Sequence, residues 1–152
     1  MRAVMRKVNT LLHESTERDK FVTAFYSVLD FKHRVLIFSN AGHNPPFLIH
    51  RDGSWSRLDA GGSVLGIDAG SEFTDEEVTL AAGDRVVLFT DGVTESTDSA
   101  GEEFGEDRLR SLAVEHCHLT AEAMHRRVLE GLLAFNSGRF EDDMTLIVLA
   151  AE

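Results

Sequence analysis

The sequence contains a single cysteine, Cys117, and no hydrophobic run that approaches the roughly 20 residues of a membrane-spanning helix. One cysteine excludes an internal disulfide framework and is typical of a protein in the reducing cytoplasm. A signal-peptide pattern is also absent, because Arg2, Arg6 and Lys7 interrupt the short apolar stretch at the start. We therefore expect a cytoplasmic protein that does not act at a membrane.

Basic residues are scarce as well: 15 Lys and Arg stand against 26 Asp and Glu, and the net charge is -11. Nucleic-acid backbones attract clustered Lys and Arg, so this balance argues against a nucleic-acid partner. Much of the acidic excess fits a solubilising surface, and part of it could be carboxylates that a bound cation neutralises. With 152 residues, of which 43 % are hydrophobic, the chain suits a single domain (residues 1–152) with a sizeable core.

Hydrophobic periodicity predicts a mixed α+β domain. Val4, Val8, Leu11 and Leu12 follow the spacing of one helical face, which Met1 and Met5 widen, so a helix is expected from the start to residues 13–16. A helix capped by Thr120 is also expected; its apolar face would be Ala121, Met124, Val128, Leu132 and Phe135. A short helix is expected around residues 109–113. The expected strands are 21–29, 35–38, 47–50, 55–58, 72–80, 86–89 and 144–151.

Several of these strands are apolar on both faces, although the connections between them look like hairpins. Such a sheet needs a cover on each face, which a second sheet on one side and helices on the other would supply. We therefore expect an α-β-β-α sandwich of antiparallel sheets flanked by helices.

Two aspartates stand at the ends of strands that are expected to be buried. Asp91 directly follows one strand, with Gly92 next to it, and Asp142 precedes the last strand. If these strands are antiparallel neighbours, both carboxylates lie at one rim of the sheet. A hard divalent cation would relieve their repulsion, and oxygen ligands favour Mg²⁺ or Mn²⁺ over zinc. The alternative is two unrelated aspartates that cap turns.

Around these aspartates the sequence resembles a known family. The motifs are Phe-Thr-Asp-Gly-Val-Thr-Glu at 89–95, Asp-Asp-Met-Thr at 142–145 and Asn-Ala-Gly-His-Asn-Pro-Pro at 40–46. Together they are similar to the PPM-type metal-dependent serine/threonine phosphatases, above all to the bacterial SpoIIE/RsbU-like branch. Further short matches at 64–67, 83–84 and 104–105 follow in the same order, and the resemblance extends from about residue 9 to 149.

The resemblance implies the same α-β-β-α sandwich and hydrolysis of phosphoserine or phosphothreonine on a protein. A phosphorylated anti-sigma-factor antagonist in bacterial signalling is one such substrate. Asp91 and Asp142 would be ligands in a site for Mn²⁺ or Mg²⁺, which holds two ions in the complete domain. Asp143 would support these ligands, as would Gly92, and no catalytic side chain is expected beyond the metal site.

The roles of two further residues in these motifs can be interpreted in more than one way. His43 could bind the substrate or donate a proton, or it could only stabilise its turn. Glu95 could orient a metal-bound water or cap the backbone locally. The sequence leaves both choices open.

The resemblance is incomplete at the N-terminal side. The family's domain begins earlier, with a Gly-Asp strand motif and an Asp-x-x-Gly turn that supply a carboxylate shared by two metals. No segment before Asp91 resembles either motif. We therefore expect the C-terminal portion of a phosphatase domain, with weak metal binding at most. Apolar surface left uncovered in this way predicts a possible homodimer.

Two alternatives to a phosphatase of this family remain. One is a catalytically inactive module that docks a partner. The other is a haloacid-dehalogenase-like phosphatase, which Val93 argues against because that family places a second Asp there.

Overall fold

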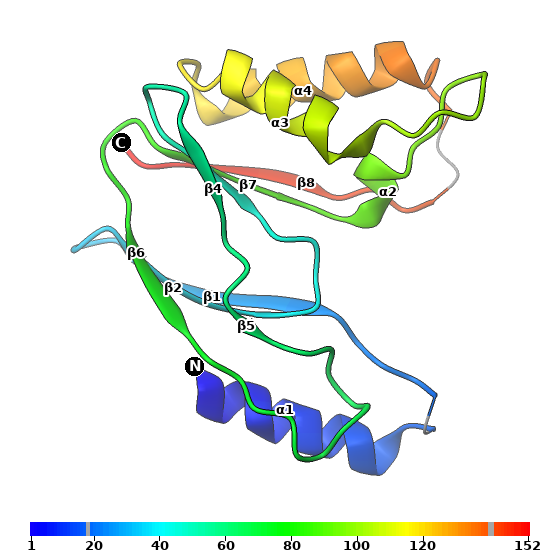
Figure 1. Ribbon diagram of the computed structural model, residues 1–152. Coiled ribbons are helices and arrows are strands. Elements are labelled where there is room, and N and C mark those ends of the chain that lie inside the picture. Colours follow the sequence, from blue (N-terminus) through cyan, green and yellow to red (C-terminus); the bar gives the residue numbers. More distant parts are fainter. Residues whose placement is uncertain (18, 140–141) are drawn as a thin grey trace. The chain divides into compact units, whose positions relative to one another are not determined.

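The structure is a computed structural model that describes residues 1–17, 19–139 and 142–152. The chain forms two compact units (Figure 1). Unit 1 comprises Met1–Pro45 and Leu58–Leu80, and unit 2 comprises Pro46–Arg57 and Ala81–Glu152. Each unit contains its own four-stranded sheet. The expectation of one domain over residues 1–152 stays a prediction.

Unit 1 is built around strand β2 (Val35–Ala41), the longest interior strand of its sheet. Strand β1 (Ala24–Asp30) pairs with β2 in antiparallel register, from Ala24 opposite Ala41 to Asp30 opposite Val35. Strands β5 (Gly61–Gly62) and β6 (Glu76–Thr79) pair with different parts of β2, β5 in parallel and β6 in antiparallel orientation. The predicted hairpin of the first two strands is therefore confirmed.

The turn of this hairpin is held by the side chain of Asp30. Its Oδ1 atom accepts hydrogen bonds from the backbone N–H groups of Lys32 (2.9 Å) and His33 (3.0 Å). The expectation that β1 is buried on both faces is wrong, because Tyr26 and Val28 are exposed. β1 is an edge strand, paired along its length with β2 alone, so its outer face lacks the cover that an interior strand receives.

Helix α1 (Arg2–Ser15) packs on the unit 1 sheet through Met5 and Leu12, which are only part of the predicted face. Met5 is buried against Ala41, Leu65 and Phe73, whereas Val4, Val8 and Leu11 are exposed. The polar Asn9 takes the buried position four residues after Met5.

Asn9 is buried because its side chain joins the helix to the loop after Leu65. Its Nδ2 donates to the carbonyl of Asp68 (2.8 Å), and its Oδ1 accepts from the N–H of Gly66 (2.8 Å). Both ends of the amide are thereby satisfied, which removes the penalty for burying a polar group. A count of apolar residues alone could not identify this face.

Unit 2 contains an antiparallel sheet in the order β4-β3-β7-β8. The strands are β3 (Phe47–Ile49), β4 (Trp55–Arg57), β7 (Arg85–Phe89) and β8 (Leu146–Ala150). β7 lies between β3 and β8 and is almost wholly buried, as its unbroken apolar run predicts. The predicted hairpin of β3 and β4 is also present.

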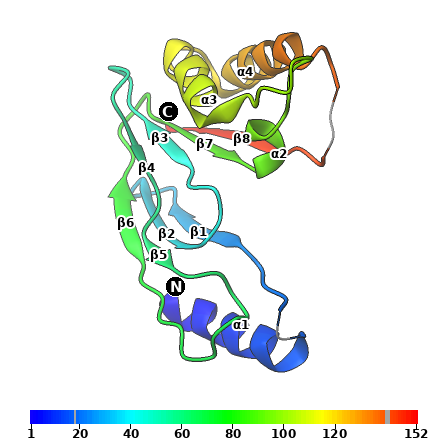
Figure 2. The same cartoon turned by 45° about the vertical axis from the view of Figure 1, so that its right-hand side comes forward.

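Helices α3 (Gly105–Glu115) and α4 (Ala121–Phe135) run side by side over one face of this sheet (Figure 2). Thr120 caps α4, since its Oγ1 accepts from the N–H of Ala123 (3.3 Å). The predicted face of α4 is confirmed: Met124, Val128 and Leu132 are completely buried. Burial of each such side chain contributes about 1.5–3 kcal/mol, so this layer supports the strand that carries the candidate site.

Strand β8 differs from its prediction as a buried strand. Leu146 and Val148 pack on the core, whereas Ile147 and Leu149 on the other face are 46 % and 37 % exposed. β8 pairs only with β7 and is therefore an edge strand. Within the described ranges, no helix is long and apolar enough to cross a membrane.

Candidate functional site

The candidate site begins where β7 ends and a single helical turn, α2 (Asp91–Thr94), takes over. The carbonyl of Asp91 accepts from the N–H of Glu95 (2.8 Å) and from the Oγ1 hydroxyl of Thr94 (3.2 Å). These bonds close the turn, so the buried strand passes directly into a rigid segment that begins with Asp91. Gly92 does not adopt a positive φ angle here, so the turn itself does not require a glycine.

The predicted antiparallel pairing of the two aspartate-bearing strands is confirmed. β7 pairs with β8 from Arg85 opposite Ala150 to Phe89 opposite Leu146. Beyond the last pair, Thr90 and Thr145 continue the contact: the N–H of Thr90 donates to the carbonyl of Thr145 (3.1 Å), and the N–H of Thr145 donates to Thr90 Oγ1 (3.0 Å). The end of one strand therefore lies beside the start of the other.

Gly92 lies against the backbone of the segment that precedes β8. A Cβ atom at this position would lie 2.4 Å from the carbonyl oxygen of Asp143 and 3.6 Å from the Cα of Met144. Only a residue without a side chain permits this approach. The close approach at Gly92 is therefore to the chain's own backbone. Gly92, which follows Asp91, is thus in contact with Asp143, which follows Asp142.

Both candidate ligands are exposed and each is oriented by the next backbone amide. Oδ1 of Asp91 accepts from the N–H of Gly92 (3.0 Å), and Oδ1 of Asp142 accepts from the N–H of Asp143 (2.7 Å). The second oxygen of each carboxylate forms no hydrogen bond with the residues that the structure describes, so it is available to solvent or a cation. That Asp91 and Asp142 share one cation stays a prediction.

The described residues do not by themselves form a complete metal centre. Within residues 1–17, 19–139 and 142–152, no group of three or more His, Cys, Asp and Glu side chains could hold an ion. Two carboxylates would leave most of an octahedral Mg²⁺ shell to water. The residues therefore fit part of a metal site and not a two-metal cluster.

The two open candidates, His43 and Glu95, have clear structural surroundings. In unit 1, the N–H of His43 donates to Asn40 Oδ1 (2.8 Å), and Asn40 Nδ2 donates to the carbonyl of His43 (2.9 Å). This reciprocal pair supports the turn-stabilising interpretation of His43. In unit 2, Glu95 is the C-terminal cap residue of α2 and its side chain is exposed.

Sequence reasoning did not identify Asn136, which joins the two chain segments that flank the site. It is 2 % exposed, and its Nδ2 donates to Ser96 Oγ (2.9 Å) and to the carbonyl of Arg139 (2.6 Å). Its Oδ1 accepts from the N–H of Gly138 (2.9 Å). The only sequence signal is a polar residue that follows the apolar face of α4, which is also typical of an ordinary helix end.

Comparison with known proteins places this geometry in a family. The family model described as "Stage II sporulation protein E (SpoIIE)" matches residues 1–152. Phosphoserine phosphatase RsbU of Bacillus subtilis is 32 % identical over 147 residues, which cover 96 % of this chain and 44 % of RsbU. The chain thus spans less than half the length of this relative.

Solved structures show the fold. The structure of the SiaA-PP2C domain of Pseudomonas aeruginosa is similar, with a TM-score of 0.84 at 19 % identity. The match covers 99 % of this chain and 61 % of the SiaA chain. The manganese-presoaked SpoIIE phosphatase domain of Bacillus subtilis is also similar, with a TM-score of 0.69 at 21 % identity. That match covers 99 % of this chain and 65 % of the SpoIIE chain. The expected α+β fold of the PPM-type phosphatases is confirmed, and the chain belongs to the SpoIIE family.

Proposed function

We propose that the protein acts, as part of a phosphatase domain, in the hydrolysis of phosphoserine or phosphothreonine on a protein of bacterial signalling. The observation that carries this proposal is the pairing of β7 with β8, which brings the segments of Asp91 and Asp142 together at one sheet end. The SpoIIE family match and the phosphoserine phosphatase RsbU support the reaction class.

In this proposal Asp91 and Asp142 each provide one carboxylate oxygen to Mn²⁺ or Mg²⁺. Asp143 supports them through its backbone, since its carbonyl fixes Gly92 and its N–H orients the Asp142 carboxylate. Further ligands are needed, because two carboxylates hold neither one ion tightly nor two ions together. The domain is therefore proposed to be complete only with additional carboxylates.

The test is phosphate release from a phosphoserine protein in the presence of Mn²⁺. The 152-residue chain is compared with a version extended upstream of Met1 where the coding sequence continues in frame. We expect turnover in the extended version and little in the short chain. Robust turnover by the short chain would contradict the incomplete site, and the absence of turnover in both would overturn the proposed reaction.

A second candidate function is an inactive module that binds a phosphoprotein or another partner without turnover. The incomplete set of metal-binding side chains in the described residues favours it. It predicts partner binding that does not depend on Mn²⁺, and it fails if the extended version hydrolyses phosphoserine. In either case the proposed location is the cytoplasm, in line with the single cysteine.

We also propose that the protein self-associates through α1. Val4, Val8 and Leu11 form an exposed apolar stripe with alternating spacings of four and three residues, the pattern of a helix-pairing seam. Leu11→Glu should shift the protein from dimer to monomer in light scattering, whereas Thr10→Glu, which lies off the stripe, should leave the dimer intact. A monomer before any substitution would contradict this proposal.

A further inference from the structure

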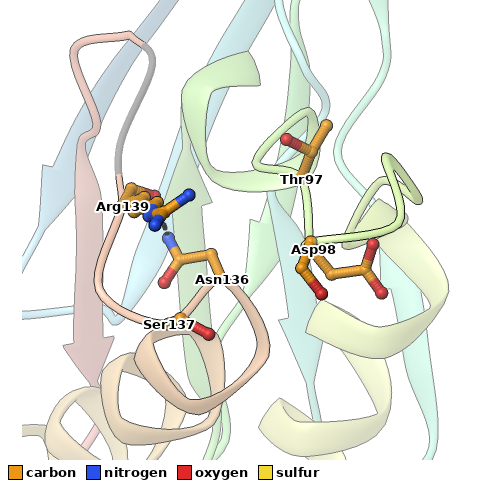
Figure 3. A pocket seen from close by; sticks show the side chains of 6 residues that line it. Thr97, Asp98, Asn136, Ser137 and Arg139 are labelled. Atoms are coloured by element: carbon orange, nitrogen blue, oxygen red, sulfur yellow. Dashed lines mark hydrogen bonds between the residues drawn. The ribbon is translucent and has the colours of Figure 1, made fainter.

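Unit 2 contains a polar pocket of about 150 Å³ between two chain segments (Figure 3). One wall is the loop after α2, with Thr97, Asp98 and Ser99, and the other is the chain after α4, with Asn136, Ser137 and Arg139. A water molecule occupies about 30 Å³ of liquid, so the pocket has room for a group of a few heavy atoms.

Hydrogen bonds hold both walls in place. Asn136 lies at the base and joins Ser96 on one wall to Arg139 on the other through its buried amide. On the loop side, Asp98 Oδ1 accepts from the N–H groups of Ala100 (2.8 Å) and Glu102 (2.9 Å). These bonds hold the shape of the pocket. They commit Oδ1 of Asp98 to its own loop, whereas Oδ2 accepts no hydrogen bond from the residues that the structure describes.

Apart from Oδ2 of Asp98, the groups that remain available in the pocket are mostly donors. Arg139 lies on the α4 side of the pocket, across from Thr97 and Asp98 on the loop side (Figure 3). Within the described ranges, the guanidinium of Arg139 forms no ion pair. The side-chain hydroxyls of Thr97 and Ser137 form no hydrogen bonds with these residues either. A guanidinium beside hydroxyl donors is suited to a carboxylate, which it can bind through two parallel hydrogen bonds.

The pocket is close to the candidate metal ligands along both walls. Arg139 precedes Asp142 by three positions, so their Cα atoms lie at most about 11 Å apart, at about 3.6 Å per residue. Thr97 follows α2, which begins with Asp91. An extended peptide covers the same distance in about three residues. A side chain near a bound phosphoserine can therefore reach this pocket.

Ser137 follows the C-cap residue of α4 and has the left-handed backbone conformation that ends many helices. Its φ angle is 54°, in the left-handed region, and the residue is not glycine. This conformation costs roughly 1–2 kcal/mol for a residue with a Cβ atom, and it closes the helix, since the N–H of Gly138 donates to the carbonyl of Leu133 (3.1 Å). Glycine would remove the strain but also the hydroxyl that faces the pocket.

We propose that this pocket binds the carboxylate of an Asp or Glu side chain of the phosphoprotein substrate, two or three residues from the phosphorylated residue. This inference rests on the proposed function, which supplies the phosphoprotein. Arg139 pairs with the carboxylate, and the hydroxyls of Thr97 and Ser137 donate to it. Because the protein has a net charge of -11, a preference for an acidic peptide requires a specific basic site and cannot arise from overall attraction.

The experiment measures binding of fluorescein-labelled phosphoserine peptides to the 152-residue chain by fluorescence anisotropy at physiological salt. The peptides carry Glu or Lys at positions two and three residues from the phosphoserine. We expect the unchanged chain to bind the Glu peptide about tenfold more tightly, as one charge-assisted pair implies. Arg139→Glu should reverse this preference. Equal affinities in the unchanged chain, or no measurable binding of the Glu peptide, would overturn the proposal.

Two variants separate recognition from folding. Arg126→Glu makes the same charge change on α4, about 14 Å before the helix end at about 1.5 Å per residue, and should retain the preference for the Glu peptide. Ser137→Gly should raise the melting temperature and yet weaken binding of the Glu peptide about threefold. A higher melting temperature with unchanged affinity would assign Ser137 no part in binding.

The outcome is independent of the turnover assay. If the extended version hydrolyses phosphoserine but Arg139→Glu does not reverse the peptide preference, the phosphatase proposal stands and the subsite is wrong. If the preference reverses but no version shows turnover, the pocket is a binding site of an inactive module.

Discussion

Replacement of Gly92 by alanine is expected to lower the free energy of unfolding by about 3 kcal/mol, which is large for the addition of one methyl group. The new Cβ atom would lie 2.4 Å from the carbonyl oxygen of Asp143. This partner is backbone held by the start of β8, so it cannot move aside as a flexible side chain would. The turn of α2 and the segment before β8 must therefore separate. Urea unfolding followed by circular dichroism measures the change.

Gly131→Ala is the matched control. Its Cβ atom would lie 2.6 Å from Leu112 Cδ1, which is the end of a flexible side chain. Alanine also favours the helix by about 1 kcal/mol relative to glycine, so the net change should be small. If Gly92→Ala were as stable as the unchanged protein, the backbone contact between α2 and Asp143 would not hold the site together.

The second large effect is expected for the two candidate ligands in the extended version. Asp91→Asn and Asp142→Asn should each lower Mn²⁺-dependent phosphate release by about a hundredfold or more, the size of effect seen when one strong electrostatic group is lost from an active site. Both residues are exposed, and an asparagine Oδ1 can still accept the hydrogen bond from the following N–H. The stability should therefore change by less than about 0.5 kcal/mol.

Asp107→Asn provides the control for loss of one negative charge. Its side chain is 86 % exposed on α3, where it pairs with Arg110 (2.9 Å). It should retain full turnover. Retained turnover in Asp91→Asn would remove that residue from the metal site, and equal losses in all three variants would point to a general effect of charge.

The sequence predicted the elements well where the signal was local. The β7 run, the Thr120 cap and the face of α4 depend on neighbouring residues, and the structure confirms them. The burial of β1 and β8 was wrong because a strand's position at a sheet edge depends on distant partners. The face of α1 was predicted only in part, because Asn9 is buried by two hydrogen bonds that apolar spacing cannot indicate.

The candidate site shows the same division. Asp91 and Asp142 could be predicted to approach each other, because both stand at strand ends and antiparallel pairing is the simplest arrangement. The reason for Gly92 could not be predicted, since it depends on a carbonyl 51 positions away in the chain. No sequence motif indicates the pocket at Arg139, because its two walls are joined by the hydrogen bond between Asn136 and Ser96, which are far apart in the chain.

The order in which the chain visits its two units has a consequence for folding. Residues 46–57 belong to unit 2 but stand between two parts of unit 1, so neither unit is one continuous stretch of sequence. A fragment that begins at Ala81 would lack β3, the strand that hydrogen-bonds to one side of β7. A single cut therefore cannot release unit 2 by itself, and the closure of long loops must precede formation of the second sheet, which slows folding. Proteolysis within residues 46–57 should consequently unfold both units together.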